Sequence, residues 1–170
     1  MGYVHNTSMI QYVSPFQMFG TTATWVVAAG AVSGTLAYHA DATDESATCS
    51  IPIPVPSNSK AQAGSYLKAI EVDYEVLIAA CDAVSAVVNR VTRGANGAVA
   101  VVDTLAFSYD TGHDTAPERL TLDQHRMKLT LDTPLWLDEE EYIIVVLTFD
   151  KAATTTIDVL GAFAEFTVRL

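Results

Sequence analysis

The most strongly apolar stretch of the chain runs from Tyr142 to Asp150, where hydrophobic residues follow one another without alternation. The stretch is short and rich in β-branched residues, which favours a strand over a helix. An unbroken apolar run is typical of a strand that is covered on both faces. We therefore expect a central strand here, with the other strands arranged as its partners.

Two further segments alternate strictly between apolar and polar residues, as expected of strands with one buried and one solvated face. In residues 66–79, the two predicted faces are Ile70, Val72, Tyr74, Val76 and Ile78 on one side, and Glu71, Asp73 and Glu75 on the other. In residues 125–131, the two sets are Met127, Leu129 and Leu131, and Arg126, Lys128 and Thr130. The apolar set of each strand is predicted to face the core.

The segment from Ser50 to Pro56 alternates proline with Ile51, Ile53 and Val55. Proline has no N–H group to donate to a β-ladder, so a central strand is excluded here. We expect an edge strand whose β-branched residues face inward. The alternative is a linker of polyproline type.

Residues 82–93 are open to two interpretations. Their valines follow helical spacing between Asp82 and Gly94, but the β-branched content favours a strand, which we prefer. A hairpin turn is then expected at residues 94–97, with the chain returning over residues 98–109. Short strands are expected at residues 25–27 and 34–38. Trp136 is expected on a connection, and a final strand over residues 155–170 contains Gly161, which favours a bulge.

These segments give about eight antiparallel strands at the spacing of a sandwich. The predicted fold is all-β, a single β-sandwich of jelly-roll type over residues 21–170. Residues 1–20 show no strand alternation and are predicted to form an N-terminal arm. Its aromatic residues and the first tryptophan are predicted to pack at an interface between subunits: Tyr3, Tyr12, Phe16, Phe19 and Trp25.

Composition changes this picture in two ways. Half of the 170 residues are hydrophobic and only 17% are charged, which is below the usual quarter and favours a homo-oligomer that buries part of its surface. Sandwich faces rich in alanine and threonine would lower the charge without partners. The net charge of −11 repels nucleic acid and anionic membranes, so neither is expected as a partner.

Targeting and cysteine signals are weak. The chain does not begin with a basic region followed by a short apolar core, so no secretory signal is expected. Glycines and polar residues interrupt the stretch 23–40, and its hydrophobicity is too low for a membrane span. Cys49 and Cys81 lack a CxxC partner and are expected to pack as small hydrophobic residues. A disulfide between them stays open, because the sequence does not give their separation.

The most site-like polar stretch carries Asp110, Asp114 and Glu118, which are weak candidates for Ca²⁺ ligands. Their spacing does not match an EF-hand, and a solvated loop with capped turns is favoured. The acidic run 138–141 is expected to be a solvated turn beside the central strand.

No catalytic or cofactor motif is present in the sequence. The four histidines, His5, His39, His113 and His125, form no HxH pair, and no nucleophile elbow, P-loop or GxGxxG sequence occurs. We expect no enzyme activity and no cofactor. A hydrolase or lyase on a jelly roll would need carboxylates or histidines clustered inside the sandwich.

The aromatic residues offer one binding hypothesis. Two or three coplanar exposed rings on a β-sandwich would form a sugar-stacking platform, drawn from Tyr3, Tyr12, Trp25, Tyr66, Tyr109 and Trp136. Packing in the core or at an interface is the commoner fate of such rings and is favoured here.

The apolar central strand, the Ile-Pro-Ile-Pro-Val-Pro edge, the aromatic arm and the low charge resemble phage head-decoration proteins and related capsid-surface β-sandwiches. The resemblance implies a non-enzymatic virion protein that self-associates, for example as a trimer, on a larger protein shell or filament. The alternative is an extracellular carbohydrate-binding β-sandwich module. An assembly protein would bury its tryptophans and arm between chains, whereas a sugar binder would expose two or more aromatic rings on one face.

Overall fold

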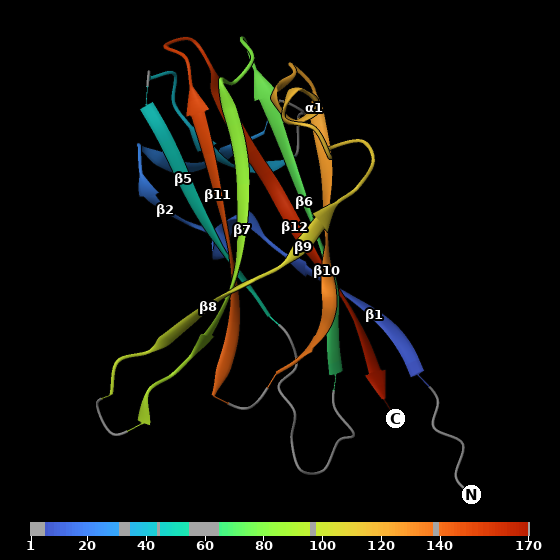
Figure 1. The fold of residues 1–170 in the computed structure, drawn as a ribbon. Coiled ribbons are helices and arrows are strands. Elements are labelled where there is room, and N and C mark those ends of the chain that lie inside the picture. The colour runs from blue at the N-terminus through green and yellow to red at the C-terminus, as the bar shows by residue number, and fades with distance from the viewer. Residues whose placement is uncertain are drawn as a thin grey trace, which may run out of the picture.

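The computed structural model describes residues 6–30, 35–43, 45–54, 65–95, 98–137 and 140–169. Two antiparallel β-sheets pack face to face and form a β-sandwich of jelly-roll type (Figure 1), which confirms the predicted all-β fold. The described residues form twelve strands rather than about eight, because part of the predicted arm also pairs and the predicted returning segment 98–109 is divided into two strands.

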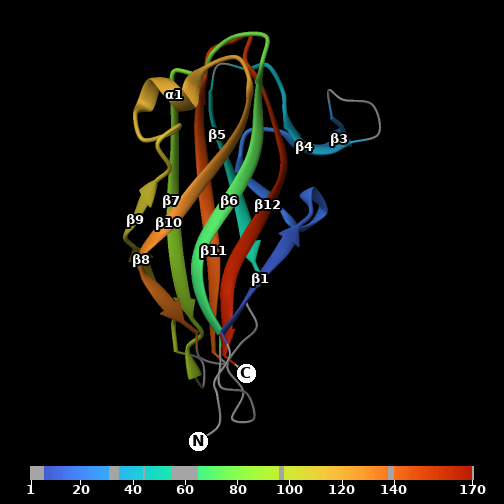
Figure 2. The same ribbon diagram turned by 90° about the vertical axis from the view of Figure 1, so that its right-hand side faces the viewer.

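The seven-stranded sheet has the order β3 (Trp25–Ala29), β4 (Leu36–Ala40), β12 (Thr156–Arg169), β6 (Ser65–Leu77), β10 (Gln124–Trp136) and β9 (Phe107–Tyr109), with β1 (Asn6–Val13) also paired to β12. The five-stranded sheet has the order β2 (Phe19–Thr22), β5 (Glu45–Ile53), β11 (Glu141–Lys151), β7 (Ala83–Thr92) and β8 (Val101–Leu105). Figure 2 shows the two layers from the side, with β6, β10 and β12 in front of β5, β7 and β11.

Two short helices accompany the strands, the 3₁₀ helix η1 (Pro15–Gln17) and the α-helix α1 (Ala116–Leu120). Neither is long and apolar enough to cross a membrane, and this holds for every helix in the part of the chain that the structure describes.

Strand β11 is the central strand of the five-stranded sheet, as predicted, and lies between β5 and β7. Its inward side chains are fully buried: Ile143, Val145, Leu147 and Phe149. The expectation that both faces are covered is not met within this chain, since Ile144 and Val146 point outward and are only half-buried. The unbroken apolar run therefore combines a core face and an apolar outer face.

The two alternating segments form β6 and β10 with the predicted inward faces. The buried residues are Ile70, Val72, Tyr74, Val76, Met127, Leu129 and Leu131. The prediction for Ile78 is wrong: β6 ends at Leu77, and Ile78 lies in the following turn with φ of 71° and 71% exposure. Trp136 lies within β10 rather than on a connection, because the strand continues past a register shift between Thr130 and Leu135.

The proline segment is an edge strand over its described part. β5 pairs with β11 as far as Ile53, whereas β2 covers only Thr48, Cys49 and Ser50 of its other side. Ile51 and Ile53 are buried, as predicted. Val55 and Pro56 lie outside the described residues.

Residues 83–92 form strand β7, so the preferred interpretation is confirmed and the helical one is wrong. β7 pairs with β8 as a hairpin, although Asn96 and Gly97 of its predicted turn lie outside the described residues. The returning chain divides between the sheets: β8 joins the five-stranded sheet and β9 joins the seven-stranded one.

The expectation of an N-terminal arm without strand structure is wrong for residues 6–13, which form β1 and pair with β12. Val13 and Met18 belong to the hydrophobic core. The physical reason is that β4 pairs with β12 only as far as Val159. The rest of that edge of β12 needs another partner, and β1 supplies it. Phe16 and Phe19 are exposed, while Tyr3 lies outside the described residues, and the role of these rings at an interface stays a prediction.

Both cysteines are free and buried. Burial raises the pKa of each thiol to about 12, because an apolar environment disfavours the thiolate. Cys49 and Cys81 therefore pack as small hydrophobic residues in the core, as predicted.

Candidate functional site

The outer face of the seven-stranded sheet gathers the densest set of polar and aromatic side chains. Strand pairing places one residue from each of four strands in a row, in the order Tyr12, Phe163, Glu71 and Lys128. The next row contains Gly161, Asp73 and Arg126. We name this surface the charged face and define it by Ile10, Tyr12, Tyr66, Glu71, Asp73, Arg126, Lys128, Trp136, Phe163 and Glu165.

A bulge in β12 shapes the charged face. The register of β12 on β6 shifts between Val159 and Gly161, as the glycine predicted, and the other edge of β12 changes its partner there from β4 to β1. Gly161 has φ of 154°, and a methyl group on it would lie 2.5 Å from the Tyr12 ring. The glycine therefore lets the ring lie directly against the backbone.

The Tyr12 ring is fixed at both ends. Its hydroxyl donates a hydrogen bond to the Leu160 carbonyl at 3.1 Å, and its ring centroid lies 5.2 Å from that of Phe163. Partial burial, together with the nearby Asp73 carboxylate, raises the pKa of the Tyr12 hydroxyl, so it stays protonated. Tyr12 is nevertheless 49% exposed and presents ring surface to solvent.

A second aromatic pair lies farther along the same face. Tyr66 and Trp136 are directly opposite each other on β6 and β10, with ring centroids 4.9 Å apart. They point outward because their neighbours Leu67 and Leu137 are buried. Tyr66 is level with Thr167, which lies four residues beyond Phe163 on β12. At the rise of a strand, the two aromatic pairs are therefore about 13 Å apart along the strand direction.

Ion pairs lie on both sides of the Phe163 row: Arg126 and Asp73 in the row farther from Tyr66 and Trp136, and Lys128 with its glutamates toward that aromatic pair. Arg126 donates to both Asp73 oxygens, at 2.8 and 3.0 Å, and its guanidinium carbon lies 5.9 Å from the Phe163 ring centroid. Lys128 Nζ lies 2.8 Å from Glu165 and 3.3 Å from Glu71. The hydrogen bond to Asp73 raises the pKa of Arg126, and the bond to Glu165 raises that of Lys128, so both cations stay charged.

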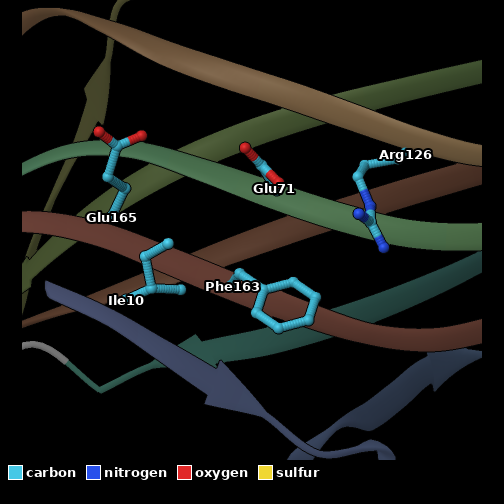
Figure 3. Close-up of a pocket in the computed structure, with 5 residues that line it drawn as sticks. All are labelled: Ile10, Glu71, Arg126, Phe163 and Glu165. Carbon is cyan, nitrogen blue, oxygen red and sulfur yellow. The ribbon is translucent and has the colours of Figure 1, made fainter.

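Two hollows open on the charged face. The first, of about 200 Å³, is lined by Ile10, Glu71, Arg126, Phe163 and Glu165 (Figure 3). The second, of about 410 Å³, is lined by Tyr12, Ser14, Pro15, Thr35, Leu36, Asp73, Gln124 and Leu160. The Arg126–Asp73 ion pair connects them, since Arg126 lines the first hollow and Asp73 lines the second. We refer to the two hollows together as the groove; both have apolar and charged residues in their walls.

The structure divides the aromatic residues of the sugar-platform hypothesis. It brings Tyr12, Tyr66 and Trp136 onto the charged face. Trp25 instead stacks on Tyr38 with centroids 4.9 Å apart, and the Arg119 guanidinium covers the Tyr109 ring at 4.3 Å. These two rings serve packing, as the favoured alternative predicted.

Phe163 is the functional candidate that the sequence analysis missed. It lies in the final strand, where the predicted bulge obscures the inside–outside alternation. Glu165, two residues farther along, marks the same outward face and is the signal by which Phe163 could have been found.

The candidate calcium ligands serve as caps. The Asp110 carboxylate accepts hydrogen bonds from the Lys128 amide at 2.8 Å, the Gly112 amide at 3.2 Å and His113 Nδ1 at 2.9 Å. Burial acts to raise the pKa of Asp110, but these hydrogen bonds outweigh it and hold the pKa below the ordinary value. Glu118 accepts from the Thr115 amide and closes the capping box of α1. Asp114 lies beside it, and no group of three metal-ligating side chains occurs among the described residues.

The histidines pair across the fold rather than along the sequence. His113 Nε2 and His125 Nδ1 lie 3.4 Å apart beneath α1, and His39 Nδ1 lies 2.6 Å from the buried Asp158. His5 lies outside the described residues. The first contact joins the loop before α1 to β10, whereas the second joins the paired strands β4 and β12; none of these four residues lines the groove.

No protein-family model matches the chain, and no curated protein matches it. Among solved structures, the chain is similar to a xylan-binding domain from CBM 22, with 9% identity over 93% of both chains and a TM-score of 0.46. It is also similar to TmCBM61 in complex with β-1,4-galactotriose, with 11% identity over 95% of this chain and 86% of that one, at a TM-score of 0.37.

A third similar structure is a family 11 carbohydrate-binding module from Clostridium thermocellum, in complex with a β-1,3-1,4-mixed-linked tetrasaccharide. The identity is 8% over 98% of this chain and 89% of that one, at a TM-score of 0.35. At such identities the likeness concerns the fold alone.

The expected role as a virion or capsid-decoration protein is wrong. The similar structures named above are carbohydrate-binding modules and not phage decoration proteins. Self-association and an extracellular location stay predictions.

Proposed function

We propose that this protein is a non-catalytic carbohydrate-binding module that holds a glycan chain along the charged face. The observation that carries the proposal is the presence of two aromatic pairs, Tyr12–Phe163 and Tyr66–Trp136, on one outer sheet face with hydrogen-bonding side chains between them.

The chemistry of a sugar chain matches this arrangement. Each sugar ring has an apolar face of C–H groups and a rim of hydroxyl groups, so it needs apolar surface and hydrogen-bond partners side by side. Phe163 and Ile10 supply apolar surface to the first hollow, while Arg126, Glu71 and Glu165 supply donors and acceptors. The ion pairs fix these polar groups in place, which reduces the entropy lost on binding.

The spacing of the aromatic pairs favours an extended ligand. A separation of about 13 Å along the strands is longer than a single sugar ring, so both pairs are used only by an oligosaccharide or a polysaccharide chain. We infer that the chain lies roughly along β6 and β12, with one sugar ring near each aromatic pair.

A non-catalytic role fits the way in which the carboxylates of the groove are paired with cations. Asp73 is paired with Arg126, and Glu71 and Glu165 share Lys128. A glycoside hydrolase needs one carboxyl group that stays protonated near neutral pH, which an apolar environment provides. Each carboxylate of the groove faces a cation rather than an apolar environment.

The test is binding of a polysaccharide panel by affinity electrophoresis, followed by calorimetry with oligosaccharides of the best ligand. Phe163→Ala and Trp136→Ala should each raise the dissociation constant at least about tenfold, because each removes an aromatic contact surface. Phe19→Ala is the matched control, since Phe19 is an exposed ring on the other sheet. Undiminished binding by both the Phe163 and the Trp136 variant, or no binding of the wild type to any glycan, would overturn the proposal.

A further inference from the structure

We propose that the groove selects glycans without carboxylate groups, and that Glu71 and Glu165 set this selection by holding Lys128 between them. The inference rests on the proposed glycan-binding function and names the class of glycan that the same face accepts.

The charges in the groove carry the inference. Three carboxylates, those of Glu71, Asp73 and Glu165, face two cations, Arg126 and Lys128, which leaves one net negative charge. Glu75 lies one step farther along the outer face of β6 and is half-buried. The whole chain carries a net charge of −11, which adds a repulsive long-range field for any anionic ligand.

Both cations are already paired with carboxylates of the protein. Arg126 engages Asp73 with two hydrogen bonds, at 2.8 and 3.0 Å, and Asp73 is only 8% exposed. A uronic acid that displaced Asp73 from Arg126 would leave a nearly buried carboxylate without its partner, which is strongly unfavourable. Lys128 lies within 3.3 Å of two glutamates, so its charge is already neutralised.

Sugar hydroxyl groups meet no such conflict. A hydroxyl both donates and accepts, so it can hydrogen-bond to a carboxylate oxygen on one side and to a guanidinium or ammonium N–H on the other. The alternating charges of Glu165, Lys128, Glu71 and Arg126 present this mixture along the groove. An ionised carboxylate only accepts, and it would meet carboxylate oxygens that also only accept.

The test compares matched ligands. Cello-, manno- and galacto-oligosaccharides are titrated into the full chain before and after oxidation of their primary hydroxyl groups to carboxylates, in low-salt buffer at neutral pH. The wild type should bind the best neutral oligosaccharide at least about tenfold more tightly than its oxidised form.

Two sets of variants assign the selection to named groups. The double variant Glu71→Gln/Glu165→Gln keeps the shape of the groove, frees Lys128 and changes the net charge there from −1 to +1. It should reduce the preference for the neutral ligand about tenfold. Lys128→Gln shifts the charge the other way and should increase the preference. The control Asp82→Asn/Asp150→Asn removes the same charge at exposed positions in the five-stranded layer and should leave the preference unchanged.

The outcomes separate the two proposals. Equal or tighter binding of the oxidised ligand by the wild type would overturn the selection while the glycan-binding function stands. An unchanged preference in both groove variants would overturn the role of Glu71 and Glu165. Failure of the wild type to bind any ligand, neutral or oxidised, would overturn the proposed function and this inference together.

Discussion

The two outer faces of the sandwich share the same strand geometry but carry different kinds of side chain. On the seven-stranded sheet, one cross-strand row reads Tyr12, Phe163, Glu71 and Lys128. On the five-stranded sheet, a comparable row reads Phe19, Ser50, Val146 and Val87. We name the latter surface the apolar face and define it by Phe19, Ser50, Pro52, Val87, Ile144 and Val146.

The difference teaches where to look for a ligand site. Exposed apolar residues alone, as on the apolar face, offer contact surface without fixed hydrogen-bond partners. The charged face combines rings with ion-paired groups, and two hollows are lined in part by its residues. Directional polar groups beside apolar surface are what specific small-ligand recognition requires.

The largest expected effect is on stability, and it distinguishes residues on the inner faces of the two sheets from residues on their outer faces. Leu147→Ala removes a fully buried side chain of the central strand and should lower the free energy of unfolding by about 2–5 kcal/mol. Phe163→Ala should cost clearly less, because Phe163 is only half-buried. Chemical denaturation of both variants checks this order. If Phe163→Ala proved as destabilising as Leu147→Ala, the charged face would belong to the core rather than to a binding surface.

A second prediction concerns the bulge in β12 that positions Tyr12 on the charged face. Gly161→Ala should weaken glycan binding and lower stability by about 1–3 kcal/mol, because a methyl group there meets the Tyr12 ring and the backbone conformation is strained. Calorimetry and thermal melts measure the two effects. Gly112→Ala is the control, since its methyl group would meet the Asp110 carboxylate at 3.3 Å. Unaltered binding by Gly161→Ala would show that the position of Tyr12 does not matter.

The smallest expected effect concerns the apolar face. We predict that the chain self-associates through this face, because Ile144 and Val146 are half-exposed at the centre of the sheet and the chain carries little charge. Ile144→Thr should raise the dissociation constant of the oligomer about tenfold, while Ile10→Thr on the charged face should not. Light scattering over a dilution series measures both. A wild-type monomer at every concentration would contradict the prediction.

The sequence predicted the parts of the fold that depend on neighbouring residues. The alternation in β6 and β10 placed Tyr74, Met127 and Leu129 in the core because a strand turns successive side chains to opposite faces. The glycine in β12 predicted the bulge because other residues rarely adopt its conformation.

The site itself depends on contacts that local patterns do not encode. Tyr12 reaches the backbone of Leu160 across 148 residues of sequence, and nothing near Tyr12 indicates that β1 completes the edge of β12. The lack of information on such long-range contacts also explains the incorrect virion assignment. Low charge and an apolar central strand are features of any sandwich with an apolar outer face, so they do not identify a function.

The central claim is that a glycan lies on the charged face. The most direct measurement is an NMR titration of the ¹⁵N-labelled chain with the oligosaccharide that binds best in the panel. The account predicts that amide shifts concentrate at Tyr12, Tyr66, Arg126, Trp136 and Phe163. Shifts concentrated instead at Val87, Ile144 and Val146 would place the ligand on the apolar face and contradict the account.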